Sequence, residues 1–347
     1  MFVPQKLDTN AVSLYLRDWL PGFDKPITAQ KFNTGQSNPT FLLETCVGNY
    51  VLRQKPPGVL LKSAHAVDRE FRVQKALAGS DIPVAKMHVL CIDSSVIGSD
   101  FYVMEHIQGR NFNDPKMSEI SNHSRTAIIK NMNRVLAALH AVDIDTLKLN
   151  DFGPPGNYLE RQIRRWTKQY CASETQNIPA MNILIQRLKL EMPIDDGQRA
   201  LVHGDYRIDN LIFESAGTEC LAVLDWELST IGHPYADLAS VIMQWQLPSN
   251  RDARGLSGID RGALGLPSDT EFVEEYCELR GLDTIENFQF FLGFSFFRMA
   301  AIIQGVLKRA LDGNASNPER ALKMGSLVST FADDGLKALD QKTITFN

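Results

Sequence analysis

The segment that most constrains this chain runs from residue 202 to residue 226 and contains two short apolar runs. These runs, Leu211 to Phe213 and Cys220 to Leu224, are joined by a polar turn from Glu214 to Glu219 that contains Ser and Gly. Apolar runs of this length, bounded by Gly and Ser, predict a β-hairpin. The hairpin in turn predicts which of the polar residues around it lie close together.

Asn210 comes directly before the first predicted strand, and Asp225 comes directly after the second. Because the strands of a hairpin are antiparallel, these two residues are expected at the same open end. An amide oxygen and a carboxylate placed side by side suit Mg²⁺ that carries phosphate groups. Asp205, five residues before Asn210, adds a second carboxylate, which we predict accepts the proton of an acceptor hydroxyl group.

The order of these residues resembles that of a known enzyme family. His203-Gly204-Asp205 is followed by Asn210 after four intervening residues, and then by Asp225. This pattern resembles the catalytic core of the aminoglycoside phosphotransferase and choline kinase family, whose members share the protein kinase fold.

The resemblance implies an α+β, protein-kinase-like fold with two lobes. We expect a small N-terminal lobe, residues 1–107, built on an antiparallel β-sheet and holding the nucleotide. A larger and mainly helical C-terminal lobe, residues 108–347, would carry the catalytic residues and bind the acceptor.

The same resemblance implies transfer of a phosphoryl group from ATP, with Mg²⁺, to a hydroxyl group of a small molecule. Asp205 is then the base, and His203 braces the catalytic loop by hydrogen bonding. Arg207 stands beside the base as a third catalytic residue. Asn210 and Asp225 are the predicted metal ligands.

In the N-terminal part, β-prone runs at residues 41–46 and 50–54 flank a turn signal and predict a second hairpin. The resemblance places Arg53, late in the second run, against the nucleotide phosphates, where most kinases have lysine. By period-two alternation Val51 shares its face and would cover the adenine. Lys55 is a rival candidate, because alternation points it to the same face.

A helix is expected at about residues 64–78. It carries Glu70, which taken alone is an ordinary solvated helix charge, but which the resemblance to the kinase fold pairs with Arg53. Before the first hairpin, backbone amides around Gly35 and the side chains of Ser37 and Asn38 can form an anion-binding concavity for phosphates. An ordinary polar turn explains that stretch equally well.

Two further strands are expected at residues 86–91 and 101–107. In the resembled family the end of the second strand is the hinge between lobes, where backbone groups contact the adenine edge. By position these groups belong to Glu105, His106 and Ile107, with Met104 behind the base.

Residues 50–58 and 63–70 also resemble a kinase-like domain that is fused, in some proteins, to acyl-CoA dehydrogenase modules. This second resemblance implies a hydroxy acid or a hydroxyacyl-CoA as the phosphate acceptor. A predicted basic helix at residues 158–170 agrees with an anionic acceptor, although a solvated basic face fits it as well. Its cations at helical spacing are Arg161, Arg164, Arg165 and Lys168.

Bulk properties exclude several other classes. A net charge of −5 over 347 residues argues against general binding of nucleic acid. Five scattered cysteines without a C-x-x-C pair suit reduced thiols in a cytoplasmic protein, and the N-terminus lacks the pattern of a signal peptide. The apolar stretch from Phe288 to Leu307 approaches the length of a membrane span, but Arg298 at its middle favours a buried core helix and no membrane association.

Several alternatives stay open at this point. An aminoglycoside- or choline-type substrate fits the same motif. The arginine at the strand position and the few glycines also permit a pseudokinase that binds nucleotide without turnover. A metal hydrolase could use His203, Asp205, Asp225 and His233. The sequence leaves open the acceptor, the choice between ATP and GTP, and the oligomeric state.

Overall fold

The computed structural model describes residues 7–32, 38–56, 66–250, 253–315 and 317–341. The chain forms two compact units, each made from separate stretches of sequence. Unit 1 comprises residues 1–111, 147–149 and 210–229, and unit 2 comprises residues 112–146, 150–209 and 230–347. The boundary predicted from sequence divides the chain once, after Ile107, whereas the structural division first falls after Asn111 and later returns residues 147–149 and 210–229 to unit 1.

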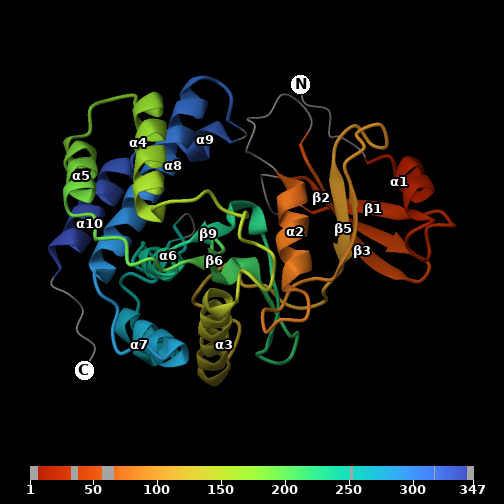
Figure 1. Cartoon of the computed structure of the whole chain (residues 1–347), viewed down its shortest axis with the longest axis horizontal. Helices are drawn as coiled ribbons and strands as arrows, with labels where there is room; N and C mark the ends of the chain where they lie inside the picture. Colours follow the sequence, from red (N-terminus) through yellow and green to blue (C-terminus); the bar gives the residue numbers. More distant parts are fainter. Residues whose placement is uncertain (1–6, 33–37, 57–65, 251–252, 316, 342–347) are drawn as a thin grey trace. The chain divides into compact units, whose positions relative to one another are not determined.

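Unit 1 is built on an antiparallel sheet of five strands in the order β1-β2-β3-β5-β4 (Figure 1). The strands predicted at residues 41–46, 50–54, 86–91 and 101–107 are all present, with ends shifted by no more than two residues. The bounds are β1 (Thr28–Lys31), β2 (Thr40–Thr45), β3 (Gly48–Gln54), β4 (Met87–Cys91) and β5 (Phe101–Glu105).

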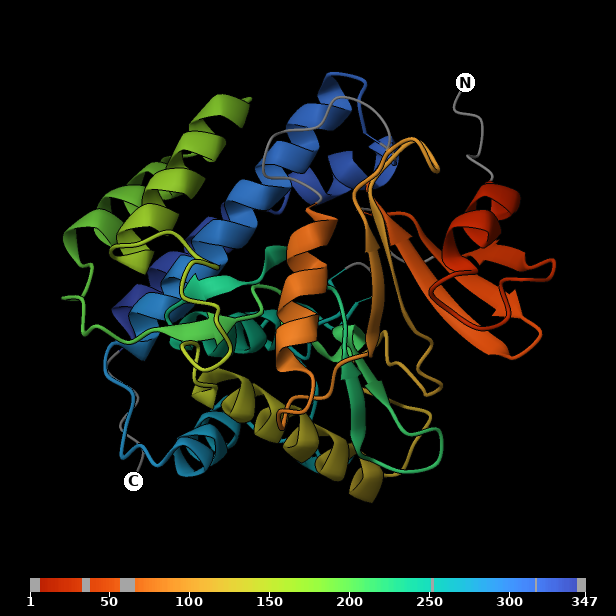
Figure 2. The same ribbon diagram turned by 45° about the vertical axis from the view of Figure 1, so that its right-hand side comes forward.

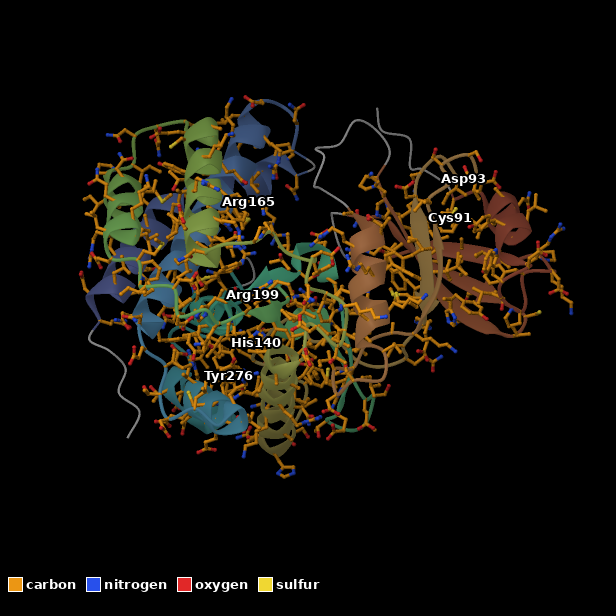
Figure 3. The ribbon with its side chains drawn as sticks, in the orientation of Figure 1. Cys91, Asp93, His140, Arg165, Arg199 and Tyr276 are labelled. Atoms are coloured by element: carbon orange, nitrogen blue, oxygen red, sulfur yellow. The ribbon has the colours of Figure 1, made fainter. Side chains whose placement is uncertain are left out.

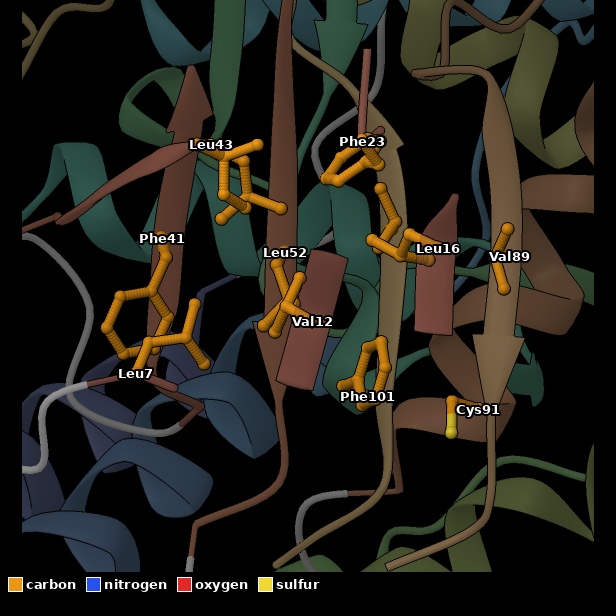
Figure 4. Packing of buried hydrophobic residues seen from close by; sticks show 12 residues of the cluster. Leu7, Val12, Leu16, Phe23, Phe41, Leu43, Leu52, Val89, Cys91 and Phe101 are labelled. Atoms are coloured by element: carbon orange, nitrogen blue, oxygen red, sulfur yellow. The ribbon is translucent and has the colours of Figure 1, made fainter. Parts of the chain in front are cut away.

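Two helices, α1 (Thr9–Leu16) and α2 (Val67–Leu77), cover opposite faces of this sheet (Figure 1). Alternation along β3 explains the two layers, because successive strand side chains point to opposite faces. Leu52 packs with α1 in one buried cluster, shown in Figure 4, whereas Val51 packs with α2 in another. The predicted helix at residues 64–78 is therefore α2, and it begins three residues later than expected.

The central hairpin is present and belongs to unit 1. Its strands β7 (Leu211–Phe213) and β8 (Cys220–Val223) are antiparallel, with Leu211 opposite Val223. A short helical turn, η2 (Trp226–Leu228), follows and packs against α2. The stretch that begins at Asn210 is thereby attached to the helix that carries Glu70.

Unit 2 is mainly helical and contains one short antiparallel ladder of β6 (Ala200–Val202) and β9 (Thr230–Gly232). In both views α8 crosses the unit as its long central helix, in contact with α4, α5, α6, α9 and α10 (Figures 1 and 2). The helices are α3 (Asn122–Ala141), α4 (Tyr158–Ser173), α5 (Pro179–Leu190), α6 (Tyr235–Trp245), α7 (Asp269–Arg280), α8 (Phe288–Leu311), α9 (Pro318–Gly325) and α10 (Val328–Asp340).

Helix α8 is the apolar stretch that the sequence analysis compared with a membrane span. By length and composition it is the one helix of the described residues that could cross a membrane, and 72% of its most apolar window is buried within the protein. This burial agrees with the prediction of a core helix. The small antiparallel sheet and the mainly helical second unit confirm the predicted α+β, kinase-like fold.

Candidate active site

Arg53 gathers three acidic side chains within unit 1. Its Nε lies 2.9 Å from Glu70 Oε2, so the predicted pair is present. Its Nη2 lies 2.5 Å from Asp225 Oδ1 and 3.7 Å from Glu227 Oε2. The rival candidate has another partner, because Lys55 Nζ lies 3.9 Å from Asp100 Oδ2 at the surface. Arg53 is therefore the cation that contacts the carboxylate of α2.

Glu70 is the buried centre of this group, with 1% of its surface exposed. The Asn38 amide donates a hydrogen bond of 2.6 Å to Glu70 Oε1, and the Tyr102 hydroxyl donates one of 3.1 Å to Oε2. Burial raises the pKa of Glu70 to about 7 against the lowering effect of Arg53, and the carboxylates of Asp225 and Glu227 raise it further.

The hairpin holds the two predicted metal ligands at its open end. The Leu224 N–H donates to the Asn210 carbonyl at 2.8 Å, so the backbone next to Asp225 is bonded to Asn210. Asp225 has a left-handed backbone conformation with φ 65° and ψ 57°. Non-glycine residues seldom adopt this conformation, which is found where surrounding structure holds a functional side chain in place. An amide oxygen and a carboxylate from these two residues fit the ligand preference of Mg²⁺.

The predicted adenine contacts fall into two groups. Glu105, His106 and Ile107 line an open cavity of about 470 Å³ together with Gly48, Asn49, Gln108 and Leu221. Val51 and Met104 do not line this cavity; they are paired across β3 and β5 and buried in the cluster under α2. Of the predicted phosphate loop, Asn38 contacts Glu70, whereas Gly35 and Ser37 lie outside the described residues.

In unit 2 the loop that carries Asp205 is held through its backbone. The N–H groups of His203 and Gly204 donate to the two carboxylate oxygens of Asp237, at 2.5 and 2.8 Å. The Asp205 N–H lies 3.2 Å from His203 Nδ1, which accepts its hydrogen bond. His203 is fully buried and Asp205 is half-buried.

Asp237 is itself supported by a buried chain of hydrogen bonds. His140 Nε2 lies 3.4 Å from Asp237 Oδ2, and His140 Nδ1 lies 2.7 Å from the Tyr276 hydroxyl oxygen. Figure 3 labels His140 and Tyr276. Burial lowers the pKa of His140, so a neutral imidazole donates from Nε2 and accepts at Nδ1. Burial alone would raise the pKa of Asp237, but its hydrogen bonds hold that pKa below the usual value. Asp237 is thus a structural residue, which holds the backbone of the loop that carries Asp205.

Arg207 and Arg254 both bind Asp209, four residues after the predicted base. Arg207 Nε lies 2.7 Å from Asp209 Oδ1, and Arg254 Nη1 lies 2.8 Å from Oδ2. These residues border a cavity of about 220 Å³ whose wall is otherwise mostly apolar. The apolar part of the wall includes Val241, Met299, Ile303, Met324, Leu327 and Phe331, and Arg320 adds a third cation.

Part of the basic helix makes local contacts. Arg161 donates to the Pro155 carbonyl at 2.9 Å, and the Arg165 guanidinium lies 5.3 Å from the ring of Trp166. Arg165 is labelled in Figure 3, on α4. The basic helix is therefore present, but two of its cations have partners within unit 2.

The proposed histidine ligands of a metal hydrolase have other partners. His203 accepts a backbone hydrogen bond, and His233 Nε2 lies 3.3 Å from Asp196. Across the residues that the structure describes, no group of three or more His, Cys, Asp and Glu side chains is arranged to hold a metal ion.

From the sequence, Glu227, two residues after Asp225, either lies near the metal ligands or faces solvent; in the structure it joins the carboxylates around Arg53. One other residue near these groups had no role in the site predicted from sequence. Arg298, which the sequence analysis used only to interpret α8, donates a hydrogen bond of 2.5 Å to the Gly204 carbonyl. That contact joins residues far apart in the chain, and no local pattern indicates it.

Residues 28–276, well over half of the chain, match the model of the Phosphotransferase enzyme family. The chain belongs to this family. It is 43% identical over 353 residues to acyl-CoA dehydrogenase family member 11 of Mus musculus, covering 99% of this chain and 44% of that protein. The chain thus spans less than half of that curated relative.

Solved structures agree with this assignment. A protein from Ralstonia eutropha, assigned to the aminoglycoside phosphotransferases, is 44% identical and superimposes with a TM-score of 0.88, covering 96% of this chain and 99% of that one. A mutant of the aminoglycoside phosphotransferase APH(4)-Ia, in ternary complex with AMP-PNP and hygromycin B, has a TM-score of 0.62 at 16% identity. It covers 94% of this chain and 98% of its own, and at this identity it shows the fold alone.

Proposed function

We propose that this protein transfers the terminal phosphoryl group of ATP, with Mg²⁺, to a hydroxyl group of a small anionic molecule. The observation that carries the proposal is the group around Arg53, which joins Glu70 and Asp225 from distant parts of the sequence at one cation. A guanidinium that forms ion pairs with carboxylates can also bind two oxygens of a phosphate group in a bidentate manner. The complex of APH(4)-Ia with AMP-PNP supports the choice of nucleotide.

Asn210 and Asp225 are the residues that would hold Mg²⁺, which when bound neutralises charge on the phosphates. Asp205 accepts the proton of the acceptor hydroxyl group. The hydroxyl oxygen forms its new bond to phosphorus as the bond from phosphorus to the bridging oxygen of ATP breaks. The products are a phosphate ester and ADP.

The acceptor class follows from the cavity beside Tyr206 to Asp209. Its apolar wall suits a hydrocarbon chain, and Arg207, Arg254 and Arg320 suit a carboxylate or phosphate group on the same molecule. Among the described residues that line this cavity Asp209 is the one acidic residue, and two arginines bind it, whereas a polycationic aminoglycoside would need an acid-rich pocket. A hydroxy acid or a hydroxyacyl-CoA therefore fits better than an aminoglycoside or choline.

Calorimetric titration with ATP, with and without Mg²⁺, is the first test. Binding that weakens when Mg²⁺ is removed supports the nucleotide site, and a screen of hydroxy acids and their CoA esters then identifies the acceptor. Asp205→Asn should keep ATP binding and lose phosphoryl transfer by about 10²- to 10⁴-fold. Absence of ATP binding under both conditions would refute the proposal, and binding without transfer to any acceptor would indicate a pseudokinase.

A further inference from the structure

Arg298 is a cation placed near the middle of the long, largely buried helix α8 of unit 2. Its side chain is half-buried, and among the described residues it forms no ion pair with a carboxylate. Two contacts hold the guanidinium instead. Nη2 donates to the Gly204 carbonyl at 2.5 Å, and the guanidinium carbon lies 5.6 Å from the centre of the Trp166 ring. A cation kept in such surroundings without a carboxylate partner requires a reason other than an ion pair.

The Gly204 carbonyl belongs to the peptide group that leads into Asp205. The N–H of the same peptide group donates to His203 Nδ1 at 3.2 Å, so both polar ends of this peptide have a partner. The preceding peptide is held as well, because the Gly204 N–H donates to Asp237 at 2.8 Å. Arg298 is thus the partner that α8 contributes to a backbone otherwise held by His203 and Asp237.

Gly204 makes this peptide easy to rotate. Its φ of 84° lies in the region that favours glycine, and glycine has little steric barrier to leaving that conformation. Rotation of the peptide between Gly204 and Asp205 changes the ψ angle of Gly204 and the φ angle of Asp205, and a change in the Asp205 backbone redirects its carboxylate. The hydrogen bonds to the two ends of the peptide oppose this rotation.

We propose that Arg298 is a positioning residue for Asp205: it holds the Gly204 carbonyl and so sets the direction of the base. This inference rests on the proposed role of Asp205. Trp166 assists by holding the guanidinium against its ring, while its own Nε1 donates to Gln162 at 3.1 Å. Arg298 belongs to unit 2, whereas the predicted phosphate residues and metal ligands belong to unit 1.

The test uses Arg298→Met, which keeps a long side chain with good helix propensity but donates no hydrogen bond. Arg309→Met is the matched control, because it removes an exposed cation from the same helix, one whose side chain bonds to none of the described residues. Arg298→Lys is the second variant: it keeps the charge if the methionine variant does not fold, but replaces the planar guanidinium by a single ammonium.

The first readout needs no activity. In Arg298→Met the amide hydrogens of residues 204 and 205 should exchange about tenfold faster than in the unaltered protein, while those of β7 and β8 keep their rates. The second readout is kinetic: kcat should fall about 10- to 100-fold, because a small misplacement of a catalytic group is costly, with the dissociation constant of ATP unchanged. Arg309→Met should leave both readouts unchanged.

Unchanged exchange at residues 204 and 205 would overturn the inference, whatever the activity. Faster exchange with unchanged kcat would overturn it too, because Arg298 would then hold the loop without positioning the base. If the unaltered protein binds ATP but transfers phosphate to no acceptor, the proposed function has failed, and the exchange experiment separately decides whether Arg298 holds the peptide.

Discussion

Replacing Glu70 with glutamine removes a buried carboxyl group whose pKa is raised from 4.5 to about 7. A carboxyl group with a higher pKa in the folded protein binds its proton more tightly there than in the unfolded chain. Its contribution to stability is therefore fully present below pH 4.5 and is lost as the pH rises through about 7. The sign is opposite to that of an ordinary exposed ion pair.

The shift from 4.5 to about 7 sets the size of the effect. At about 1.36 kcal/mol for each pKa unit, the free energy of unfolding should fall by about 2.5 kcal/mol between pH 5 and pH 8 on account of this one group. The glutamine that replaces Glu70 does not titrate, and its amide oxygen can still accept the hydrogen bond from Asn38. The variant should therefore lose this part of the pH dependence.

Urea unfolding of both proteins at pH 5 and pH 8, without nucleotide, measures the effect. The fall in the free energy of unfolding from pH 5 to pH 8 should be about 2–3 kcal/mol larger in the unaltered protein than in Glu70→Gln. Subtracting one protein from the other removes the contribution of histidines, which titrate equally in both. Glu44→Gln, an exposed glutamate of the same sheet, is the control and should behave like the unaltered protein. Equal pH dependence in the unaltered protein and Glu70→Gln would refute the reasoning about the three carboxylates.

Three further outcomes are expected. Arg53→Met should weaken ATP binding at least about tenfold by calorimetry, because phosphate loses its two-pronged cation, whereas Lys55→Met should stay within about threefold; equal losses would contradict the assignment of Arg53. In Asp237→Asn an NH₂ group replaces one of the two carboxylate oxygens that accept buried N–H groups, so the free energy of unfolding measured in urea should fall by about 2–4 kcal/mol. Tyr206→Phe removes the 2.8 Å hydrogen bond to the Met132 carbonyl and should lower the free energy of unfolding by about 1–2 kcal/mol. An unaltered free energy of unfolding would contradict this and mean that another donor replaces the tyrosine hydroxyl.

Much of unit 1 could be predicted because its signals are local. The hairpin strands at Leu211 and Cys220 are bounded by turn residues, and the alternation along β3 places Val51 and Leu52 on opposite faces. The pairing of Arg53 with Glu70 required the resemblance to the kinase fold, since periodicity alone left Glu70 as an ordinary helix charge.

The unpredicted features depend on tertiary packing. β6 and β9 have three residues each and pair only because distant segments meet, so neither has a pattern of its own. Arg298 contacts Gly204 across 94 positions of sequence. The left-handed conformation of Asp225 is fixed by its surroundings in the folded protein, and an aspartate gives no sign of it in the sequence.

The return of residues 210–229 to unit 1 limits how that unit can be studied alone. A fragment that stops near Asn111 would keep Arg53 and Glu70 but lack Asp225 and Glu227, so its buried guanidinium would lose two of its three carboxylates. It would also expose the side of α2 against which η2 packs. An independently folding nucleotide-binding fragment therefore has to join residues 7–111 to residues 147–149 and 210–229 through designed linkers, because truncation alone cannot supply all three stretches of unit 1.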